Sequence, residues 1–217
     1  MNRRMGCAAI GASVFVCAGS AMAASPITAT FDSDAQNFQG STISTTQIHL
    51  GAGGNPGGFI EIRRDLGGPA FDIGTENMAT PEFLGDYVAG GINEAGFDLR
   101  VPSTPVADVW LRFRSTVTMN GWYHPYGAPS NDNVWHEYSS SFDPSWDDAT
   151  ALGNGWLQEA GAGTFSDTMK TVGWIEVRLI TIESTLADID NVYIVPTPGA
   201  LALSVVGMGF GLRRRSR

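Results

Sequence analysis

The chain has 217 residues, of which 43% are hydrophobic and 16% are charged, and its formal net charge at pH 7 is −9. All 22 acidic residues lie between Asp32 and Asp190, where only 7 basic residues accompany them, so this central part carries a formal charge of −15. Such an acidic surface disfavours nucleic acids and anionic lipids as partners of the folded protein, and favours divalent cations or neutral ligands.

The N-terminal residues have the order of a secretory signal. Two arginines, at positions 3 and 4, precede an apolar run rich in small residues, and Ala21 and Ala23 fit the A-x-A cleavage pattern. We therefore predict a signal peptide over residues 1–23, which signal peptidase removes by cutting before Ala24. Both cysteines of the chain lie within it, so the exported domain is expected to fold without disulfides.

The central part shows short alternating runs separated by glycine and proline, without a long helical periodicity. This pattern predicts an all-β fold, an antiparallel β-sandwich. One short helix is expected over Thr164–Thr171, and loops over Gly51–Gly58 and Ala79–Tyr87. The expected strands, in chain order, cover residues 27–31, 41–50, 59–64, 96–101, 109–114, 134–142, 173–182 and 189–195.

The strand at 109–114 has a clear alternation. Its predicted inward set is Val109, Leu111 and Phe113, and its outward set is Trp110, Arg112 and Arg114. Three tryptophans that occur in strand patterns, Trp110, Trp135 and Trp174, are nevertheless expected mainly to pack in the core.

Several stretches occur in an order that resembles the laminin B domain, also called laminin domain IV. The stretches are Pro81–Asp86 leading into Gly96–Leu99, then Trp135–Tyr138 followed by Trp146, then Phe165–Val172, Trp174–Arg178 and Asp188–Val192. The opening Phe31-Asp32-Ser33-Asp34 with Phe38 also fits the start of many carbohydrate-binding sandwiches. The resemblance implies a jelly-roll-like β-sandwich over residues 24–194, and it carries no catalytic residues to transfer.

The last 23 residues have the order of a C-terminal sorting signal. Val195, Pro196, Thr197 and Pro198 precede an apolar run over residues 199–212, and the chain closes on Arg213, Arg214, Arg215, Ser216 and Arg217. This order resembles the PEP-CTERM sorting tail, in a VPTP form. It implies a short transmembrane helix that holds the protein in the membrane transiently, with the arginines on the cytoplasmic side. It further implies cleavage by an exosortase and transfer to the cell surface or extracellular matrix. Without processing, the domain would stay anchored and face outward.

Four aspartates form the candidate metal site. Asp188 and Asp190 are two residues apart in a predicted strand, so they share a face. The first loop, with Asp32 and Asp34, is expected beside this last strand, and clustered carboxylate oxygens are what Ca²⁺ requires. We therefore predict a structural Ca²⁺ here. In the alternative interpretation, Asp190 and Asn191 hydrogen-bond a turn and the other aspartates are solvated.

An aromatic run between Gly121 and Gly127 forms the candidate glycan site. Trp122, Tyr123 and Tyr126 are expected on a loop, where exposed rings can stack on sugars; alternatively, they fold down and cap an open end of the sandwich. No catalytic motif is present. The sequence thus favours a surface module that binds polysaccharide or neighbouring surface proteins. The alternatives are a glycan-active hydrolase or lyase that uses surface carboxylates, and a purely structural surface protein.

Overall fold

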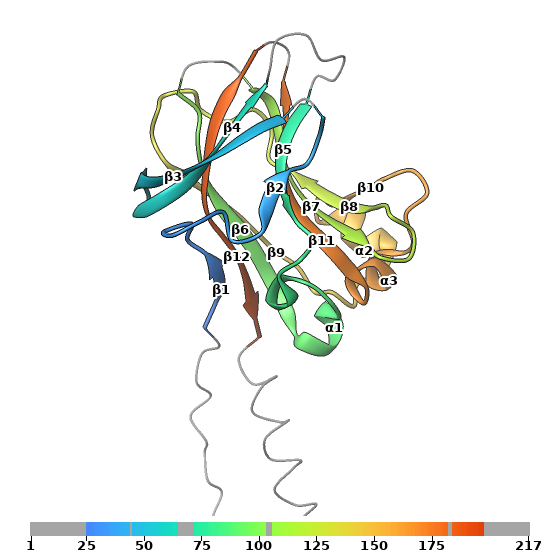
Figure 1. Cartoon of the computed structure of the whole chain (residues 1–217). Coiled ribbons are helices and arrows are strands. Elements are labelled where there is room, and N and C mark those ends of the chain that lie inside the picture. Colours follow the sequence, from blue (N-terminus) through green and yellow to red (C-terminus); the bar gives the residue numbers. More distant parts are fainter. Residues whose placement is uncertain (1–24, 44, 65–71, 103–105, 182–183, 198–217) are drawn as a thin grey trace, which may run out of the picture.

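The computed structural model describes residues 25–43, 45–64, 72–102, 106–181 and 184–197, which form two antiparallel β-sheets packed face to face (Figure 1). The predicted all-β sandwich is thereby confirmed. The predicted signal peptide, its cleavage residues Ala21, Ala23 and Ala24, and the tail from Pro198 to the arginines 213–215 lie outside the described residues. None of the described helices combines the length and the apolar composition that a membrane crossing needs.

Sheet A contains six strands in the order β3-β4-β12-β6-β9, with β1 also paired to β12. Its strands are β1 (Ile27–Ala29), β3 (Thr45–Gly54), β4 (Gly57–Arg64), β6 (Ile92–Arg100), β9 (His136–Ser141) and β12 (Leu186–Pro196). Because β1 runs antiparallel to β12 with Ile27 opposite Ile194, the described chain enters and leaves the sandwich at the same end (Figure 1).

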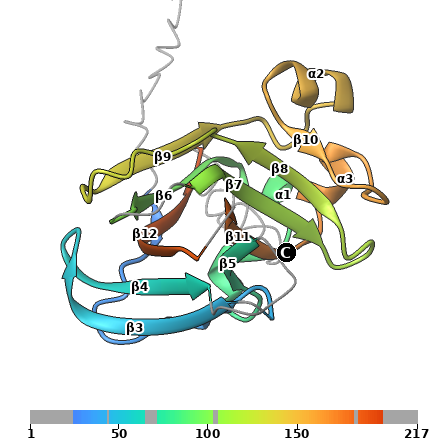
Figure 2. The ribbon, with the colours of Figure 1, turned by 90° about the horizontal axis from the view of Figure 1, so that it is seen from above.

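Sheet B also contains six strands, in the order β10-β8-β7-β11-β5-β2. They are β2 (Phe38–Gly40), β5 (Asp72–Asn77), β7 (Val106–Ser115), β8 (Gly121–Pro125), β10 (Leu157–Gln158) and β11 (Val172–Thr181). The short helices are η1 (Pro81–Phe83), α1 (Tyr87–Gly90), α2 (Asp148–Gly153) and α3 (Phe165–Met169). Figure 2 shows α2 and α3 beside the β8–β10 edge of this sheet.

The core lies between the sheets and follows the alternation of the sequence. Val109, Leu111 and Phe113 are fully buried, as predicted, and so are Phe165 and Met169 of the predicted helix, whose Thr164 side chain caps it by accepting a hydrogen bond from the amide of Asp167. Aromatic rings fill the end of the core near α3, where Trp156 stacks on Phe113 with ring centroids 5.6 Å apart. Burial of such large rings supplies much of the driving force for folding.

The glycine-rich stretch predicted as a flexible loop is instead a hairpin. Strand β3 continues to Gly54, and β4 begins at Gly57, directly opposite. Glycine is required here for close packing, because a Cβ atom at Gly58 would lie 2.0 Å from the carbonyl oxygen of Phe31 and one at Gly57 would lie 1.8 Å from Asp32 Oδ1. The alternation of the sequence did not predict β5, and β8 lies where a loop was expected.

The first residues of the predicted tail belong to a strand. Strand β12 runs through Val195 to Pro196, which pairs with Ile92. The amide and the hydroxyl of Thr197 then both donate to the carbonyl oxygen of Gly91, at 2.6 and 2.7 Å. Pro196 is tolerated because it stands at the end of the strand, where its missing N–H interrupts no further ladder. The sandwich therefore includes the first three residues of the predicted sorting motif.

Candidate functional site

The outer face of sheet B, which points away from the core, gathers charged and aromatic side chains from four adjacent strands. Their alignment follows from the strand register, which places Arg112 opposite both Tyr123 and Glu176, and Glu176 opposite Glu76. Three of the seven basic residues of the acidic central part lie on this one face. The face comprises Asp72, Glu76, Asp108, Trp110, Arg112, Arg114, Tyr123, Trp174, Glu176 and Arg178.

Two aromatic rings stack on each other at one side of this face. The rings of Trp110 and Tyr123 have centroids 4.2 Å apart at an interplanar angle of 27°. The indole of Trp110 is fixed by its Nε1, which donates to Asp108 Oδ2 at 2.7 Å. Both side chains are half-buried, and Leu157, which pairs with Tyr123, is 39% exposed. The pair is therefore a rigid, partly exposed apolar surface on a strand, and Trp110 does not pack in the core as expected.

An arginine–glutamate network occupies the centre of the face. Arg112 donates from Nε to Glu176 Oε2 at 2.6 Å, pairs with the same oxygen through Nη2, and donates from Nη1 to Glu159 Oε1 at 2.7 Å. Arg114 donates twice to Glu159, at 2.9 and 3.0 Å. Burial raises the pKa of the Glu159 carboxyl, but the hydrogen bond and charge of Arg114 and the charge of Arg112 outweigh it, so the pKa lies below its ordinary value.

The network is incomplete toward β5. Arg178 pairs with Asp72, and its Nη1 lies 3.8 Å from Glu176 Oε1, beyond hydrogen-bonding distance. Glu176 Oε1 and Arg178 Nε are buried without a hydrogen-bond partner in the described part of the chain. Burial, and then the charge of Glu176, raise the pKa of Glu76. Those two atoms of Glu176 and Arg178 are polar groups that the described side chains leave unpaired, and neither is exposed at the surface.

The three predicted glycan-binding aromatics do not act as a set. Trp122 and Tyr123 are consecutive residues of strand β8, not of a loop, so their side chains point to opposite faces of sheet B, and Tyr126 directly follows the strand. Trp122 is fully buried, and its Nε1 donates to the carbonyl oxygen of Gly163, so it cannot stack on a sugar. Tyr126 packs against Phe97, and its hydroxyl lies 2.8 Å from Ser140 Oγ. Of the three, Tyr123 alone lies on the outer face of sheet B.

The four predicted metal-binding aspartates are engaged by different partners, although Asp32 lies near enough to Asp190 for its charge to raise the Asp190 pKa. Asp188 accepts a hydrogen bond from Arg100 at 2.8 Å, and Asp34 accepts one from the amide of Gln36. Asp190 and Asn191 hold the β3–β4 turn: Asp190 Oδ2 accepts from the amide of Asn55, and Asn191 Nδ2 donates to the carbonyl oxygen of Asn55. The alternative interpretation, in which these two residues hydrogen-bond a turn, describes this geometry.

Asp190 nevertheless lies in an acidic environment. Burial raises its pKa to about 6, and the charges of Asp98 and Asp32 contribute to the rise. Within the described ranges, no group of three or more His, Cys, Asp or Glu side chains is arranged to hold a metal ion. A structural Ca²⁺ at this place therefore stays a prediction, whose test is given in the Discussion.

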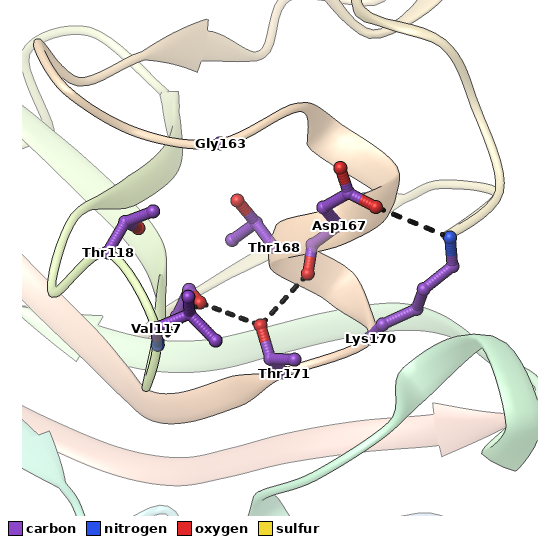
Figure 3. A pocket seen from close by; sticks show the side chains of 8 residues that line it. Val117, Thr118, Gly163, Asp167, Thr168, Lys170 and Thr171 are labelled. Atoms are coloured by element: carbon purple, nitrogen blue, oxygen red, sulfur yellow. Dashed lines mark hydrogen bonds and ion pairs between the residues drawn. The ribbon is translucent and has the colours of Figure 1, made fainter.

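Two hollows lie away from the outer face of sheet B. A groove of about 640 Å³ crosses the outer face of sheet A, with Trp135 and Tyr193 among three carboxylates, Glu94, Asp98 and Glu137. A smaller pocket of about 300 Å³ lies beside α3 (Figure 3). The hydroxyl of Thr171 in its wall donates to the carbonyl oxygen of Asp167, and no aromatic ring lines it. The Arg100 guanidinium covers the Trp135 ring of the groove, 4.6 Å from its centroid, but no stacked pair of aromatic rings lines either hollow.

No protein-family model matches the sequence, and no curated protein sequence matches it either. Solved structures do have a similar fold. The family 11 carbohydrate-binding module of the cellulase Lic26A-Cel5E from Clostridium thermocellum has a TM-score of 0.53 and 12% identity, over 81% of this chain and 97% of that one. The C-terminal family 22 carbohydrate-binding module of Clostridium thermocellum Xyn10B has a TM-score of 0.50 and 10% identity, over 80% and 94%.

An exo-β-agarase is similar as well, with a TM-score of 0.54 and 13% identity, but the match covers 79% of this chain and only 25% of that enzyme. At such low identities the likeness shows the fold alone, which is a two-sheet sandwich like those of carbohydrate-binding modules. The resemblances to laminin B and to the PEP-CTERM tail stay predictions.

Proposed function

We propose that this domain is a carbohydrate-binding module that holds an extracellular polysaccharide on the outer face of sheet B. The stacked Trp110–Tyr123 pair beside the arginine–glutamate network carries the proposal. Aromatic rings pack against the apolar faces of sugars, while fixed carboxylates and guanidinium groups bind their hydroxyls. Because the side chains stand on strands, they are held in place before the ligand arrives, which limits the entropy lost on binding.

The charge of the face indicates a neutral polysaccharide. Its arginines Arg112, Arg114 and Arg178 are each engaged by a carboxylate, so none offers a free cation to an anionic polymer. The surrounding domain, at a formal charge of −15, repels polyanions further. Neutral sugar hydroxyls, in contrast, can donate to Asp72 and accept from Arg114 and Arg178, whose partly exposed side chains surround the buried Arg112–Glu176 pair.

A hydrolase is the second candidate, and it rests on one observation. Glu76 and Glu176 stand directly opposite each other on adjacent strands, and paired carboxylates carry out glycoside hydrolysis. However, Arg112 binds the same Glu176 oxygen through two nitrogens, which ties that carboxylate into the structure. The fold likeness to carbohydrate-binding modules also favours binding over catalysis.

The cellular location is proposed from the two ends of the sequence alone. An N-terminal signal for export and a C-terminal tail of the PEP-CTERM type would bring the domain to the cell surface or matrix, where polysaccharides are abundant. Expression of the full chain with and without an exosortase tests this. Loss of the tail only in its presence, measured by mass spectrometry, would support the proposal, and identical masses would contradict it.

The binding test is a glycan array followed by calorimetry, on residues 24–197. We expect a neutral glycan to bind, and Trp110→Ala and Tyr123→Ala each to weaken binding about 2- to 13-fold, since stacking contributes about 0.5–1.5 kcal/mol. Trp135→Ala, which removes a tryptophan from the groove on the outer face of sheet A, is the matched control and should bind normally. A control that loses binding as strongly would contradict the assignment of the face, and release of reducing sugar would favour the hydrolase.

A further inference from the structure

Strand β3 is a long sheet edge without charge. It has ten residues, and within the described part of the chain β4 is the only strand that pairs with it. No Asp, Glu, Lys or Arg occurs between Asp34 and Glu61, although 16% of all residues are charged. An edge strand presents unpaired backbone N–H and C=O groups, which are a template for another strand.

The other described edges carry the usual protection. β1 and β2 have three residues each and β10 has two, so they offer little backbone to a partner. β9 is longer, but it carries His136 and the exposed Glu137. Short length and charged side chains are the devices that prevent edge-to-edge association. Of the described edges, β3 alone combines length with neutrality.

Strand β3 also has exposed apolar side chains, and hydrogen bonds already hold it in an extended conformation. Ile48 and Leu50 point to the outer face of sheet A and are each 36% exposed, and the glycines that follow leave the backbone open. On the inner side, Gln47 Nε2 donates to the carbonyl oxygen of Phe38 at 2.7 Å, and His49 Nε2 lies 2.7 Å from that of Phe31. These contacts hold the strand extended, so pairing with another strand would cost little further conformational entropy.

We propose that β3 pairs antiparallel with β3 of a second copy of this chain, so that the two A sheets become one. A two-fold axis makes the same surface meet itself, which an antiparallel strand pair satisfies. The occupant is a second copy because two acidic domains can approach each other most closely along a strip without carboxylates. A basic partner would instead be drawn to the acidic groove on the outer face of sheet A.

The pairing leaves the outer face of sheet B free, because β3 belongs to the other sheet. A dimer would therefore present two such faces to one repetitive polymer, and the second would bind at a high effective concentration. This consequence rests on the proposed carbohydrate binding, whereas the pairing itself does not. The contact is small, so a weak and reversible dimer is expected.

Sedimentation velocity of residues 24–197, which contain both sheets and the described core, tests the pairing. We expect a monomer–dimer equilibrium between about 10 µM and about 1 mM, strengthened by added salt because screening reduces the repulsion of the acidic copies. Ile48→Lys places a charge on the edge and should weaken association about tenfold or more. Val117→Lys, at a 75% exposed site in the turn after β7, adds the same charge elsewhere and should not.

The control also separates the two possible causes. Any added lysine lowers the net negative charge and would strengthen association if general repulsion alone mattered. A monomer over the whole range, or equal weakening by both variants, overturns the proposal, provided that circular dichroism shows each variant folded. Hydrogen exchange supplies a second measurement, since the amides of β3 should become protected as concentration rises. Single-site glycan affinity of Ile48→Lys should be unchanged, which keeps this test independent of the proposed function.

Discussion

The two outer faces of the sandwich arise from the same strand alternation, yet they differ in how their charges are arranged. On sheet B, arginines stand between carboxylates at the centre, and Arg112 and Glu176 are 2% and 1% exposed. On sheet A, the groove is lined by carboxylates without a basic residue. Acids therefore serve different ends in one acidic domain: those paired with arginines fix a preorganised surface, whereas the groove acids are held by neutral donors, with Asp98 buried beside the Asn191 amide and Glu137 accepting from the Tyr193 hydroxyl.

The largest effect is expected from breaking the central pair of sheet B. Arg112→Ala leaves Glu176 buried without its cation, which should lower the free energy of unfolding by about 3–5 kcal/mol. Lys170→Ala, which breaks an exposed ion pair with Asp167, is the control and should leave the denaturation midpoint almost unchanged. Urea denaturation measures both. An Arg112→Ala variant as stable as the control would show that the network is not essential to the fold.

An intermediate effect is expected from pH at the β3–β4 turn. The pKa of Asp190 is raised to about 6, so the folded state binds a proton more tightly than the unfolded state. Its contribution to stability is therefore fully present below pH 4 and is lost as pH rises through 6, by on the order of 1 kcal/mol. Thermal melts in EDTA at pH 5 and pH 7 should show this loss in the wild type and not in Asp190→Asn.

The same melts test the predicted Ca²⁺. A cation held by Asp190 and its acidic neighbours would favour the ionised carboxylate, so added Ca²⁺ should raise the melting temperature at pH 7 and flatten the pH dependence. The Asp190→Asn variant should then lose most of this increase. Absence of any shift or calorimetric heat on adding Ca²⁺ would remove the metal from this domain.

The smallest effect is expected at Glu76, which lies directly opposite Glu176 on the neighbouring strand of sheet B. Because its pKa is raised, ionised Glu76 costs stability at neutral pH, and Glu76→Gln should stabilise the domain by about 0.2–1 kcal/mol at pH 7. The gain should shrink toward pH 4, where the wild-type carboxyl is protonated. Equal gains at both pH values would indicate a packing effect and not repulsion.

The sequence predicted the sandwich and the facing of β7, because the alternation of Val109, Leu111 and Phe113 with Trp110, Arg112 and Arg114 is a local pattern. It did not predict which outward residues form a site. Trp110 was expected in the core because large rings usually are buried, and its stacking on Tyr123 depends on the register of β7 against β8. A signal was present, since an outward tryptophan followed at alternate positions by two arginines is unusual for a solvated face.

Tertiary contacts explain the other errors. The glycines between β3 and β4 indicate flexibility when taken alone, and only the approach of Phe31 and Asp32 shows that they are needed for close packing. The pairing of Asp190 with Asn55, 135 positions apart, likewise cannot be found from the spacing of aspartates. Local patterns thus predicted the strands, and long-range register decided what their outward residues do.

The place of β12 in sheet A has a mechanical consequence. This strand is hydrogen-bonded to β4, β6 and β1, and the described chain leaves the sandwich from its end at Thr197. Tension between that end and the opposite end of the sandwich acts along a central strand, so the ladders of β12 are loaded in shear and many hydrogen bonds must break together. Tension between Thr197 and the start of β1, which lies at the same end, would instead open the β1–β12 ladder one bond at a time. The sandwich is therefore built to withstand pulling along β12 from its C-terminal side.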